Sequence, residues 1–369
     1  MVKVQAIGLS EIMGSLPEIE AFNPKSSPKN KVDQLFLCAL GFEPRCLTIP
    51  SLLRRSDYRT GSCVFATYRT NVSENESNLP ELQSLLEYVS GKNILTPLEI
   101  DSIEFSNQLR EILKGLSQRT DELPSVTVDI SVFANRLIMR SFKVLIESDV
   151  NLRVLYSEAN IYHPTKEEYQ KEPSKWKDED ALGLERGVND VTISIDHPGQ
   201  HLDVLPNCIV VFPCYKAERS KAIIAKVDPS LLTSPKDKVL WVLGKPHKPE
   251  DSWREDAMRE INNIGEDQQQ HSISTFAYKD SIKVLDRIHS EKWDKCNITL
   301  APNGSKMQAL GAALFYYLHP DVRVMFATPK EYNAMQYTEG CKNTWVIDFG
   351  STRELRDLLD SVGQITIQK

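Results

Sequence analysis

The chain has 369 residues, of which 41% are hydrophobic and 26% charged, and it carries a net charge of −7. This length exceeds that of a usual single hydrophobic core, so we expect two domains. The negative net charge argues against a protein that binds DNA over its whole surface, although it allows a local cationic pocket. The longest apolar stretch, residues 309–318, is too short to span a bilayer.

Location and redox chemistry follow from the N-terminus and the cysteines. The N-terminus lacks the extended apolar segment and the cleavage site of a secretory signal, so we expect a cytoplasmic protein with no membrane partner. The seven cysteines form no CxxC pair and show no cysteine–histidine spacing typical of zinc sites. We therefore expect no metal site and no cofactor. Cys38, Cys63 and Cys208 lie in apolar runs and are expected to be inert buried thiols.

The first predicted domain spans residues 31–163 and follows a weakly patterned N-terminal extension, residues 1–30, in which Ser26–Asn30 indicates a loop. Continuous apolar runs predict buried strands, and amphipathic stretches between them predict helices. The strands are expected at 34–40, 63–68, 126–130 and 152–156, and the helices at 79–88, 106–116 and 135–147. This alternation is typical of βαβ units on a parallel sheet.

Residues 164–206 are polar and contain prolines, which indicates a linker or excursion with a solvated run at 166–180 and a short hairpin at 191–195. The second predicted domain, residues 207–369, repeats the order of the first. Its strands are expected at 208–212, 238–243, 273–276, 297–301, 322–327 and 345–349, and its helices at 219–227, 252–263, 278–290, 305–318 and 351–361.

The two domains show self-similarity at a constant offset of about 170 residues. A period this long indicates duplicated domains rather than a solenoid. We therefore predict an α/β protein of two tandem Rossmann-like parallel-sheet domains related by internal duplication. The pairs at this offset are Arg153 with Arg323, Val154 with Val324, Tyr162 with Tyr332, and Arg136 with Lys306.

Charged residues follow the first strand of each domain, where the carboxyl ends of parallel strands usually bind ligands. They are Glu43 and Arg45 in the first domain and Glu218 and Arg219 in the second. An arginine here could bind phosphate through two hydrogen bonds, with the glutamate accepting one from a ribose hydroxyl. An internal Glu–Arg pair that fastens each loop explains the same residues equally well.

The loops after the strands expected at 126–130 and 297–301 carry a second group of candidate ligand-binding residues. In the second domain Gly304 lets backbone amides approach an anion, Ser305 can cap the following helix, and Lys306 adds charge to its first turn. No GxxxxGK[ST] or GxGxxG motif is present, so neither a P-loop nor a dinucleotide fingerprint is indicated. The other candidates of this group are Asn303 in the same loop and Ser131, Asn135 and Arg136 in the first domain.

The stretch Asn303–Ala313 resembles the loop and small-residue helix of CARF domains, the Rossmann-like sensors of cyclic oligoadenylates in type III CRISPR systems. That family binds its ligand at a two-fold interface between two domains, and the related SAVED proteins fuse two such units in one chain. The resemblance implies a nucleotide-type ligand in the cleft between two domains of a sensor for bacterial antiviral defence. The chain has Ser305 where threonine is commoner in the family, and Asn135 and Arg136 depart further.

Three roles remain open at this point. The chain lacks the Arg-x4-His and Asp…Glu-x-Lys patterns of the family's effector nucleases, so a sensor would need a separate effector protein. A ring-nuclease-like phosphodiesterase could orient its substrate with Ser305, Lys306, Arg136 and Arg45. A nucleotide hydrolase could use Asp129, Glu43 or Glu218. The third role is that of a ligand-free scaffold subunit.

Overall fold

A computed structural model describes residues 3–23, 32–118, 122–177, 184–233, 237–363 and 365–368. The chain forms two compact units. Unit 1 comprises residues 1–133, 140–161 and 338–369, and unit 2 comprises residues 134–139 and 162–337. The loop expected at Ser26–Asn30 lies outside the described residues.

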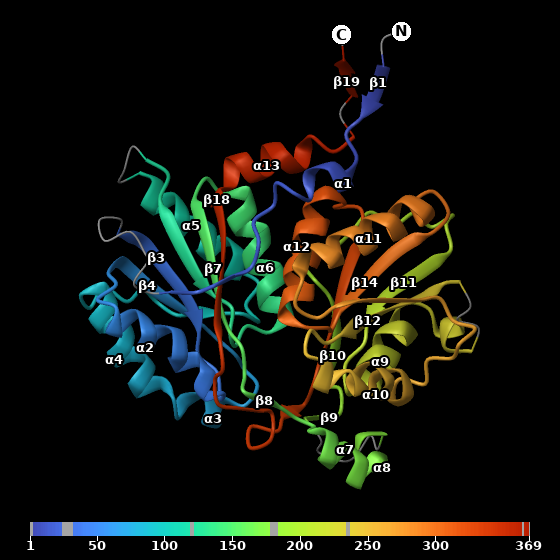
Figure 1. Ribbon diagram of the computed structural model, residues 1–369, viewed down its shortest axis with the longest axis horizontal. Coiled ribbons are helices and arrows are strands. Elements are labelled where there is room, and N and C mark those ends of the chain that lie inside the picture. The colour runs from blue at the N-terminus through green and yellow to red at the C-terminus, as the bar shows by residue number, and fades with distance from the viewer. Residues whose placement is uncertain are drawn as a thin grey trace. The chain divides into compact units, whose positions relative to one another are not determined.

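Within the described ranges, unit 1 contains a seven-stranded sheet in the order β2-β18-β7-β6-β3-β4-β5 (Figure 1). Strands β18 and β2 are antiparallel to their neighbours, whereas the other five strands are parallel to one another. The strands are β2 (Glu20–Ala21), β3 (Asp33–Ala39), β4 (Thr60–Thr67), β5 (Leu98–Glu99), β6 (Ser125–Asp129), β7 (Asn151–Ser157) and β18 (Thr344–Ser351).

Helices cover the sheet of unit 1 because side chains on the two sides of each strand are apolar. Phe36 and Cys38 of β3 pack in one cluster with side chains of α2 (Thr48–Arg55) and α4 (Leu79–Ser90). The alternate residues Leu35 and Leu37 point to the other face and are equally buried. Right-handed crossovers place α5 (Phe105–Ser117) and α6 (Asn135–Glu147) on that face. The remaining elements are α1 (Leu9–Ile12), η1 (Pro44–Leu47), α3 (Val72–Glu76), α13 (Thr352–Asp360) and the pair β1 (Lys3–Ala6) with β19 (Ile365–Gln368).

Unit 2 contains, in its described part, a six-stranded sheet in the order β10-β15-β14-β11-β12-β13. Its five parallel strands are joined by helices, and β10 is antiparallel to β15 at the edge. The strands are β10 (Asp190–Ile193), β11 (Asn207–Phe212), β12 (Val239–Lys245), β13 (Gln270–Ser274), β14 (Asn297–Pro302) and β15 (Arg323–Thr328). The helices between them are α9 (Ala217–Val227), α10 (Trp253–Ile261), α11 (Tyr278–Lys292) and α12 (Lys306–Leu318).

Close packing of α11 against α12 depends on a glycine. A Cβ atom on Gly311 would lie 2.2 Å from the backbone oxygen of Tyr278, so no larger residue fits between the two helices. The small-residue stretch of α12 is therefore buried within unit 2. Short elements complete this unit: β9 (Glu185–Arg186) with β16 (Glu331–Tyr332), α7 (Lys166–Lys171), α8 (Pro173–Lys177), η2 (Pro229–Leu232) and η3 (Pro249–Asp251). Strand β8 (Ile161–Tyr162) pairs with β17 (Thr338–Glu339), which belongs to unit 1.

The same order of five parallel strands occurs in both units, as β5-β4-β3-β6-β7 and β13-β12-β11-β14-β15. This is a doubly wound arrangement whose strand order reverses between β3 and β6 and between β11 and β14. The predicted α/β class with Rossmann-like parallel sheets is confirmed. A shared strand order is common among unrelated domains of this class, so the internal duplication stays a prediction.

The chain is divided differently from the expected boundaries at 163 and 207. Strand β18, expected in the second domain, pairs with β7 of unit 1, where Val346 lies opposite Leu155. The expected hairpin at 191–195 is instead the edge strand β10, in which Val191 pairs with Ala327 of β15. The polar run at 166–180 contains α7 and α8, whose Tyr169 and Trp176 are buried. None of the helices in the described ranges is long and apolar enough to cross a membrane.

Candidate anion-binding site

The loops after β11 and β14 of unit 2 diverge at the point where the strand order reverses. The two strands are parallel neighbours, and their last residues, Phe212 and Pro302, lie opposite each other. Helix α9 begins after one loop and helix α12 after the other. Two helix N-termini, each with its partial positive charge, therefore begin at the same edge of the sheet.

The start of α12 is held by a capping box. The Ser305 hydroxyl accepts a hydrogen bond from the Gln308 backbone N–H at 3.1 Å, and the Gln308 side chain accepts one from the Ser305 N–H at 2.9 Å. Ser305 also donates its hydroxyl proton to the Thr275 carbonyl. Gly304 makes room for this arrangement, because a Cβ there would lie 2.3 Å from Gln308 Oε1. Ser305 caps the helix as expected, and Gly304 and Ser305 together also fix the Gln308 side chain.

Asn303 and Gln308 each present a buried amide nitrogen at this helix terminus. Their exposed fractions are 6% and 2%. Asn303 Oδ1 accepts from Arg219 Nη2 at 3.3 Å, and a guanidinium can only donate, so Nδ2 is the remaining donor. Gln308 Oε1 is likewise fixed as the acceptor of the Ser305 N–H, which leaves Nε2 as the donor. Neither amide nitrogen has a hydrogen-bond partner among the residues that the structure describes.

Arg219 lies at the centre of a hydrogen-bond network in unit 2. Besides Asn303, its guanidinium donates to the Ala327 carbonyl at 3.0 Å and to Glu185 Oε2 at 3.2 Å. Burial raises the pKa of the Glu185 carboxyl, although Arg219 opposes this shift by favouring the charged form. Arg219 thus orients the Asn303 side chain, and Arg219 is itself held in place by Glu185 of β9 and by the Ala327 carbonyl of β15.

The first turn of α9 adds charged groups to the same edge. Lys216 is the N-cap residue and is 4% exposed. Glu218 follows in the first turn, and its Oε2 atom is buried with no hydrogen-bond partner in the described part of the chain. This edge therefore offers amide donors from α12 and a carboxylate acceptor from α9.

The first turn of α6 groups with unit 2. Asn135 donates from Nδ2 to the carbonyls of Pro302 and Gly304 at 2.8 Å and 2.7 Å, so it fastens the loop after β14. Arg136 on α6 and Lys306 on α12 are half-buried residues of the first helical turns. The structure thus brings Asn135 and Asn303–Lys306 together around one loop.

In unit 1, Glu43 and Arg45 form the internal pair that was the alternative interpretation. Arg45 Nη2 and Nε lie 2.6 Å and 3.1 Å from Glu43 Oε2, and both residues are buried. Arg45 also donates to the Ser157 carbonyl at 3.0 Å, and Thr338 donates to Glu43. These contacts give Arg45 the role of an anchor for the loop after β3.

Ser131 and Asp129 are likewise engaged within unit 1. Both the backbone N–H and the hydroxyl of Ser131 donate to Asp129 Oδ1, at 2.9 Å and 2.5 Å. The Ser131 oxygen in turn accepts from the Ser157 N–H at 2.8 Å. The hydroxyl proton of Ser131 is thus already used by Asp129, and the Ser131 oxygen accepts the hydrogen bond that ties the end of β6 to β7.

Gln308 is the residue of this site that the sequence analysis missed. It lies inside a helix, where glutamine is an ordinary residue. The available signal was the spacing of Ser305 and Gln308, which is that of a capping box and places the glutamine side chain over the helix start.

No protein-family model matches this sequence, and no curated protein matches it. Among solved structures, a type III CRISPR defence DNA nuclease activated by cyclic oligoadenylate matches with a TM-score of 0.43 and 12% identity, over 75% of this chain. The match covers 63% of that nuclease, so this chain spans less than two thirds of its length.

Two other matches have lower TM-scores. The cytoplasmic domain of a prokaryotic cation chloride cotransporter matches with a TM-score of 0.22 and 10% identity, over 82% of this chain and 98% of that one. A putative universal stress protein from Pseudomonas aeruginosa UCBPP-PA14 matches with a TM-score of 0.22 and 10% identity, over 83% and 95%. These likenesses carry no information about the ligand of the present chain.

Proposed function

We propose that this chain binds a nucleotide-type ligand, with cyclic oligonucleotides the leading class, through its phosphates at the start of α12 in unit 2. The observation that carries the proposal is the pair of buried amide nitrogens of Asn303 and Gln308, which have no partner among the described residues. The role as a sensor in antiviral defence rests on the resemblance of Asn303–Ala313 to CARF domains.

The amide nitrogens favour a ligand that supplies acceptor oxygens. A buried donor without a partner costs about 1–3 kcal/mol, and such groups are rare in folded proteins. Both nitrogens can only donate here, because Arg219 and the Ser305 N–H fix the orientation of the two amides. A phosphate has several acceptor oxygens and can satisfy both donors.

Charge at the same edge of unit 2 supports an anion over a neutral acceptor. Helix α12 has 13 residues, so its dipole contributes a partial positive charge at Ser305 and Lys306. Lys216 adds a cationic residue at the start of α9. The Glu218 oxygen would repel a phosphate but can accept from a hydroxyl, which a ribose provides. A sugar phosphate can accept from the amide donors of Asn303 and Gln308 and donate to the Glu218 carboxylate.

The first experiment is a thermal-shift and calorimetric screen against linear and cyclic mono-, di- and oligonucleotides. A ligand at about a hundred times its dissociation constant stabilises the folded protein by roughly 2.7 kcal/mol, which raises the melting temperature visibly. Mass spectrometry of the recovered ligand then shows whether it stays intact. If no nucleotide raises the melting temperature, the proposal is contradicted.

Two isosteric variants test the amide donors directly. Asn303→Asp and Gln308→Glu keep the oxygens that accept from Arg219 and Ser305 but replace the donors with acceptors. We expect each variant to weaken binding at least about tenfold, because a lost charge-assisted hydrogen bond is worth about 1.5–3 kcal/mol. Because each variant also buries a carboxylate, the melting temperatures of the ligand-free variants are measured to show that each still folds.

Gln268→Glu is the matched control for these variants. It makes the same amide-to-acid change in unit 2, and Gln268 Oε1 keeps its hydrogen bond from Trp241 Nε1 at 2.6 Å. Gln268 precedes β13 and so lies toward the amino ends of the parallel strands. Binding should be unchanged in this variant.

Lys306→Glu should abolish binding with a nearly unchanged melting temperature, and retained binding would contradict the anion site.

The unpartnered Glu218 oxygen favours a nucleotide-cleaving enzyme as the second candidate function. A carboxylate that accepts from a ribose hydroxyl can also act as a general base toward it. Turnover of the bound ligand, lost in Glu218→Gln while binding remains, would establish this function.

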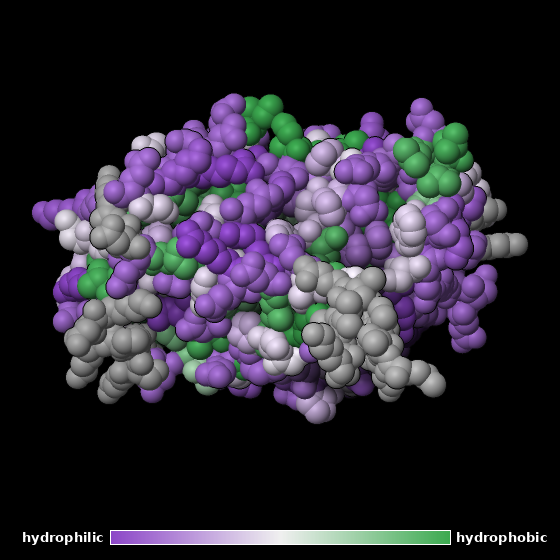
Figure 2. Space-filling model, turned by 90° about the horizontal axis from the view of Figure 1, so that it is seen from above, coloured by the Kyte–Doolittle hydropathy of each residue, from purple (hydrophilic) through white to green (hydrophobic). Residues whose placement is uncertain are grey.

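The scaffold role is supported less, because Phe315 and Tyr316 of α12 and Leu355 of α13 are buried. Figure 2 shows a largely hydrophilic face on which apolar side chains form small separate groups.

A further inference from the structure

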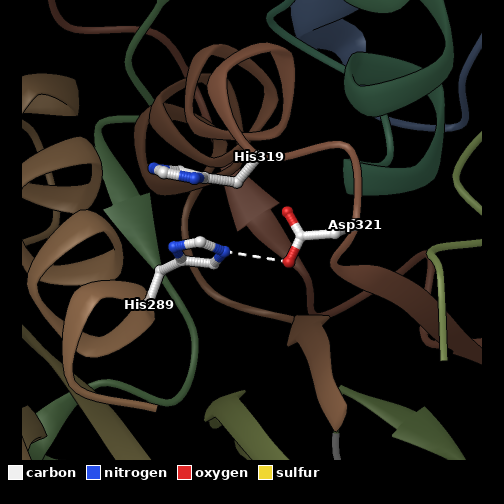
Figure 3. A group of neighbouring side chains, drawn as sticks. All are labelled: His289, His319 and Asp321. Carbon is white, nitrogen blue, oxygen red and sulfur yellow. Dashed lines mark hydrogen bonds and ion pairs between the residues drawn. The ribbon is translucent and has the colours of Figure 1, made fainter. Parts of the chain in front are cut away.

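Three side chains of types that can ligate a metal meet at the opposite edge of the unit 2 sheet, near the amino end of β15 (Figure 3). His289 lies in the last turn of α11, His319 is the C-cap residue of α12, and Asp321 precedes β15. Each offers one ligand atom, and these atoms lie within 4.8 Å of one another. His289 Nε2 is 2.9 Å from Asp321 Oδ2.

We propose that His289, His319 and Asp321 bind a divalent transition metal ion, with Zn²⁺ the best fit. Two imidazoles and one carboxylate are ligands that zinc accepts in tetrahedral coordination. Three protein ligands leave a fourth position for water. This inference is independent of the nucleotide site.

An ion would draw together the three ligand atoms, which now lie within 4.8 Å of one another. Metal–ligand bonds of about 2.0–2.2 Å place tetrahedral ligand atoms about 3.3 Å apart. The His289 and Asp321 atoms, now 2.9 Å apart, would separate by a few tenths of an ångström. The Asp321 side chain is 40% exposed, whereas that of His289 is 12% exposed, so an ion could enter on the side of Asp321.

Asp286 prepares His319 for coordination. Its Oδ1 atom lies 2.9 Å from His319 Nε2, so in the neutral ring the proton sits on Nε2 and Nδ1 keeps its lone pair. A carboxylate behind a ligating histidine is the usual outer partner in zinc sites. The centroids of the two imidazole rings are 3.8 Å apart with an angle of 31° between the ring planes, and Phe315 packs beside both, so the rings turn when both bind one ion. Asp286 is a positioning residue in this proposal.

Two helix C-termini add favourable electrostatics. His289 is in the last turn of α11, and α12 ends at His319. The carbonyl ends of helices carry a partial negative charge that favours a cation. No metal site was expected because the chain has no short cysteine–histidine spacing, whereas His289 and His319 are 30 positions apart. Only the packing of α11 against α12 brings them together.

The test is a Co²⁺ titration of the untagged, chelator-stripped full chain, followed by visible d–d absorption. We expect one equivalent to bind with a four-coordinate spectrum that lacks sulfur charge-transfer bands, and Zn²⁺ to displace it. His289→Gln and His319→Gln should each weaken binding more than about tenfold. Asp286→Asn should weaken it about 10–100-fold, as outer partners of zinc ligands do.

His271→Gln is the control, because His271 lies on β13 and its Nδ1 contacts Arg287 Nη2 at 2.9 Å. It should leave Co²⁺ binding unchanged. The absence of stoichiometric binding to the wild type, a sulfur-type spectrum, or unchanged binding in both His289→Gln and His319→Gln would overturn the proposal. The wild-type spectrum decides the matter even if a variant fails to fold, and metal-free melting temperatures identify that case.

Discussion

Glu43 and Arg45 form an ion pair that is almost closed off from solvent, with side chains 7% and 3% exposed. Taking both charges out of water costs several kcal/mol per ion, and their attraction offsets this only while both partners are present. The additional contacts to Ser157 and Thr338 satisfy further hydrogen-bonding groups of the pair. The pair therefore makes the loop after β3 sensitive to single substitutions.

We predict that Arg45→Met lowers the free energy of unfolding by about 3–5 kcal/mol, because it leaves the Glu43 carboxylate buried without its cation. The double variant Glu43→Gln/Arg45→Met should recover much of this loss, because neither residue then carries a charge. Urea unfolding curves of the wild type and the two variants measure the difference. A loss below about 1 kcal/mol in the single variant would mean that Arg45 is exchangeable with solvent and free to bind phosphate.

The roles of candidate residues in the loop after β14 could be predicted from the sequence, whereas those in the loop after β11 could not. The roles of Gly304 and Ser305 at the helix start follow from local chain geometry, and the structure has the cap that the sequence indicates. The engagement of Arg219 with Glu185 and Asn303 could not be predicted, because it joins residues 34 and 84 positions apart. Long-range partners decide whether a charged loop residue faces a ligand or the protein.

At the scale of elements, α13 shows how a terminal helix is attached. Arg353 and Arg356 donate hydrogen bonds to Asp149, in the turn before β7, at 2.7 Å and 2.5 Å. The Thr352 hydroxyl oxygen also accepts a hydrogen bond from the Val150 N–H at 3.0 Å. The hydrogen bonds from Arg353 and then Arg356 lower the pKa of Asp149 to about 2.

The attachment of α13 should weaken at acidic pH, where Asp149 becomes protonated. A carboxyl whose pKa is lower in the folded state contributes stability above its unfolded pKa of about 3.9, and this contribution disappears as the pH falls toward 2. Because Asp149 is 40% exposed, its contribution is expected to stay below about 1 kcal/mol. Asp149→Asn should therefore lower the melting temperature slightly at pH 7 and not at pH 2. An equal difference at both pH values would contradict this role.

Eight of the ten parallel strands in the two described sheets could be predicted, because each contains a continuous apolar run, which marks a strand buried on both faces. Strand β5 has two residues and was not predicted, and β13, which is polar and half-buried, lies at Gln270–Ser274 instead of the expected 273–276. The prediction at 34–40 corresponds to β3 and the one at 297–301 to β14. The sheet to which β18 belongs could not be predicted, because a strand pattern does not name its partner. Its neighbour β7 lies almost 190 residues earlier in the chain. Which strands pair over such long sequence separations is decided by the packing of the whole sheet and not by the local sequence.

At the scale of the molecule, unit 2 is inserted into unit 1. The chain leaves unit 1 after Ile161 and returns at Thr338, and the Asn160 N–H donates to the Glu339 carbonyl at 3.1 Å beside this junction. The C-terminal segment then contributes β18 and α13 to unit 1. A change in β18 is therefore a change in unit 1, although it lies after unit 2 in the sequence.

Hydrogen–deuterium exchange can test this assignment. Ile347 of β18 is 1% exposed and pairs with Val154 of β7. We predict that Ile347→Asp increases deuterium uptake in β7 and leaves β15 unchanged, because a buried carboxylate disrupts the edge of the unit 1 sheet. Ile193→Asp, on the 46% exposed residue of edge strand β10, is the control and should leave β7 unchanged. Increased uptake in β15 with Ile347→Asp would place β18 in unit 2 instead.

The insertion has a consequence for the order in which the protein can form on the ribosome. Strand β7 is synthesised before unit 2, but its neighbour β18 emerges only after almost 190 further residues. At about 5–20 residues per second, this interval lasts on the order of ten to thirty seconds. Unit 2 is complete before unit 1 can close its sheet, so the nascent chain holds the apolar edge of β7 unpaired throughout that time. Chaperones that shield exposed strands have their longest opportunity to act at this stage of synthesis.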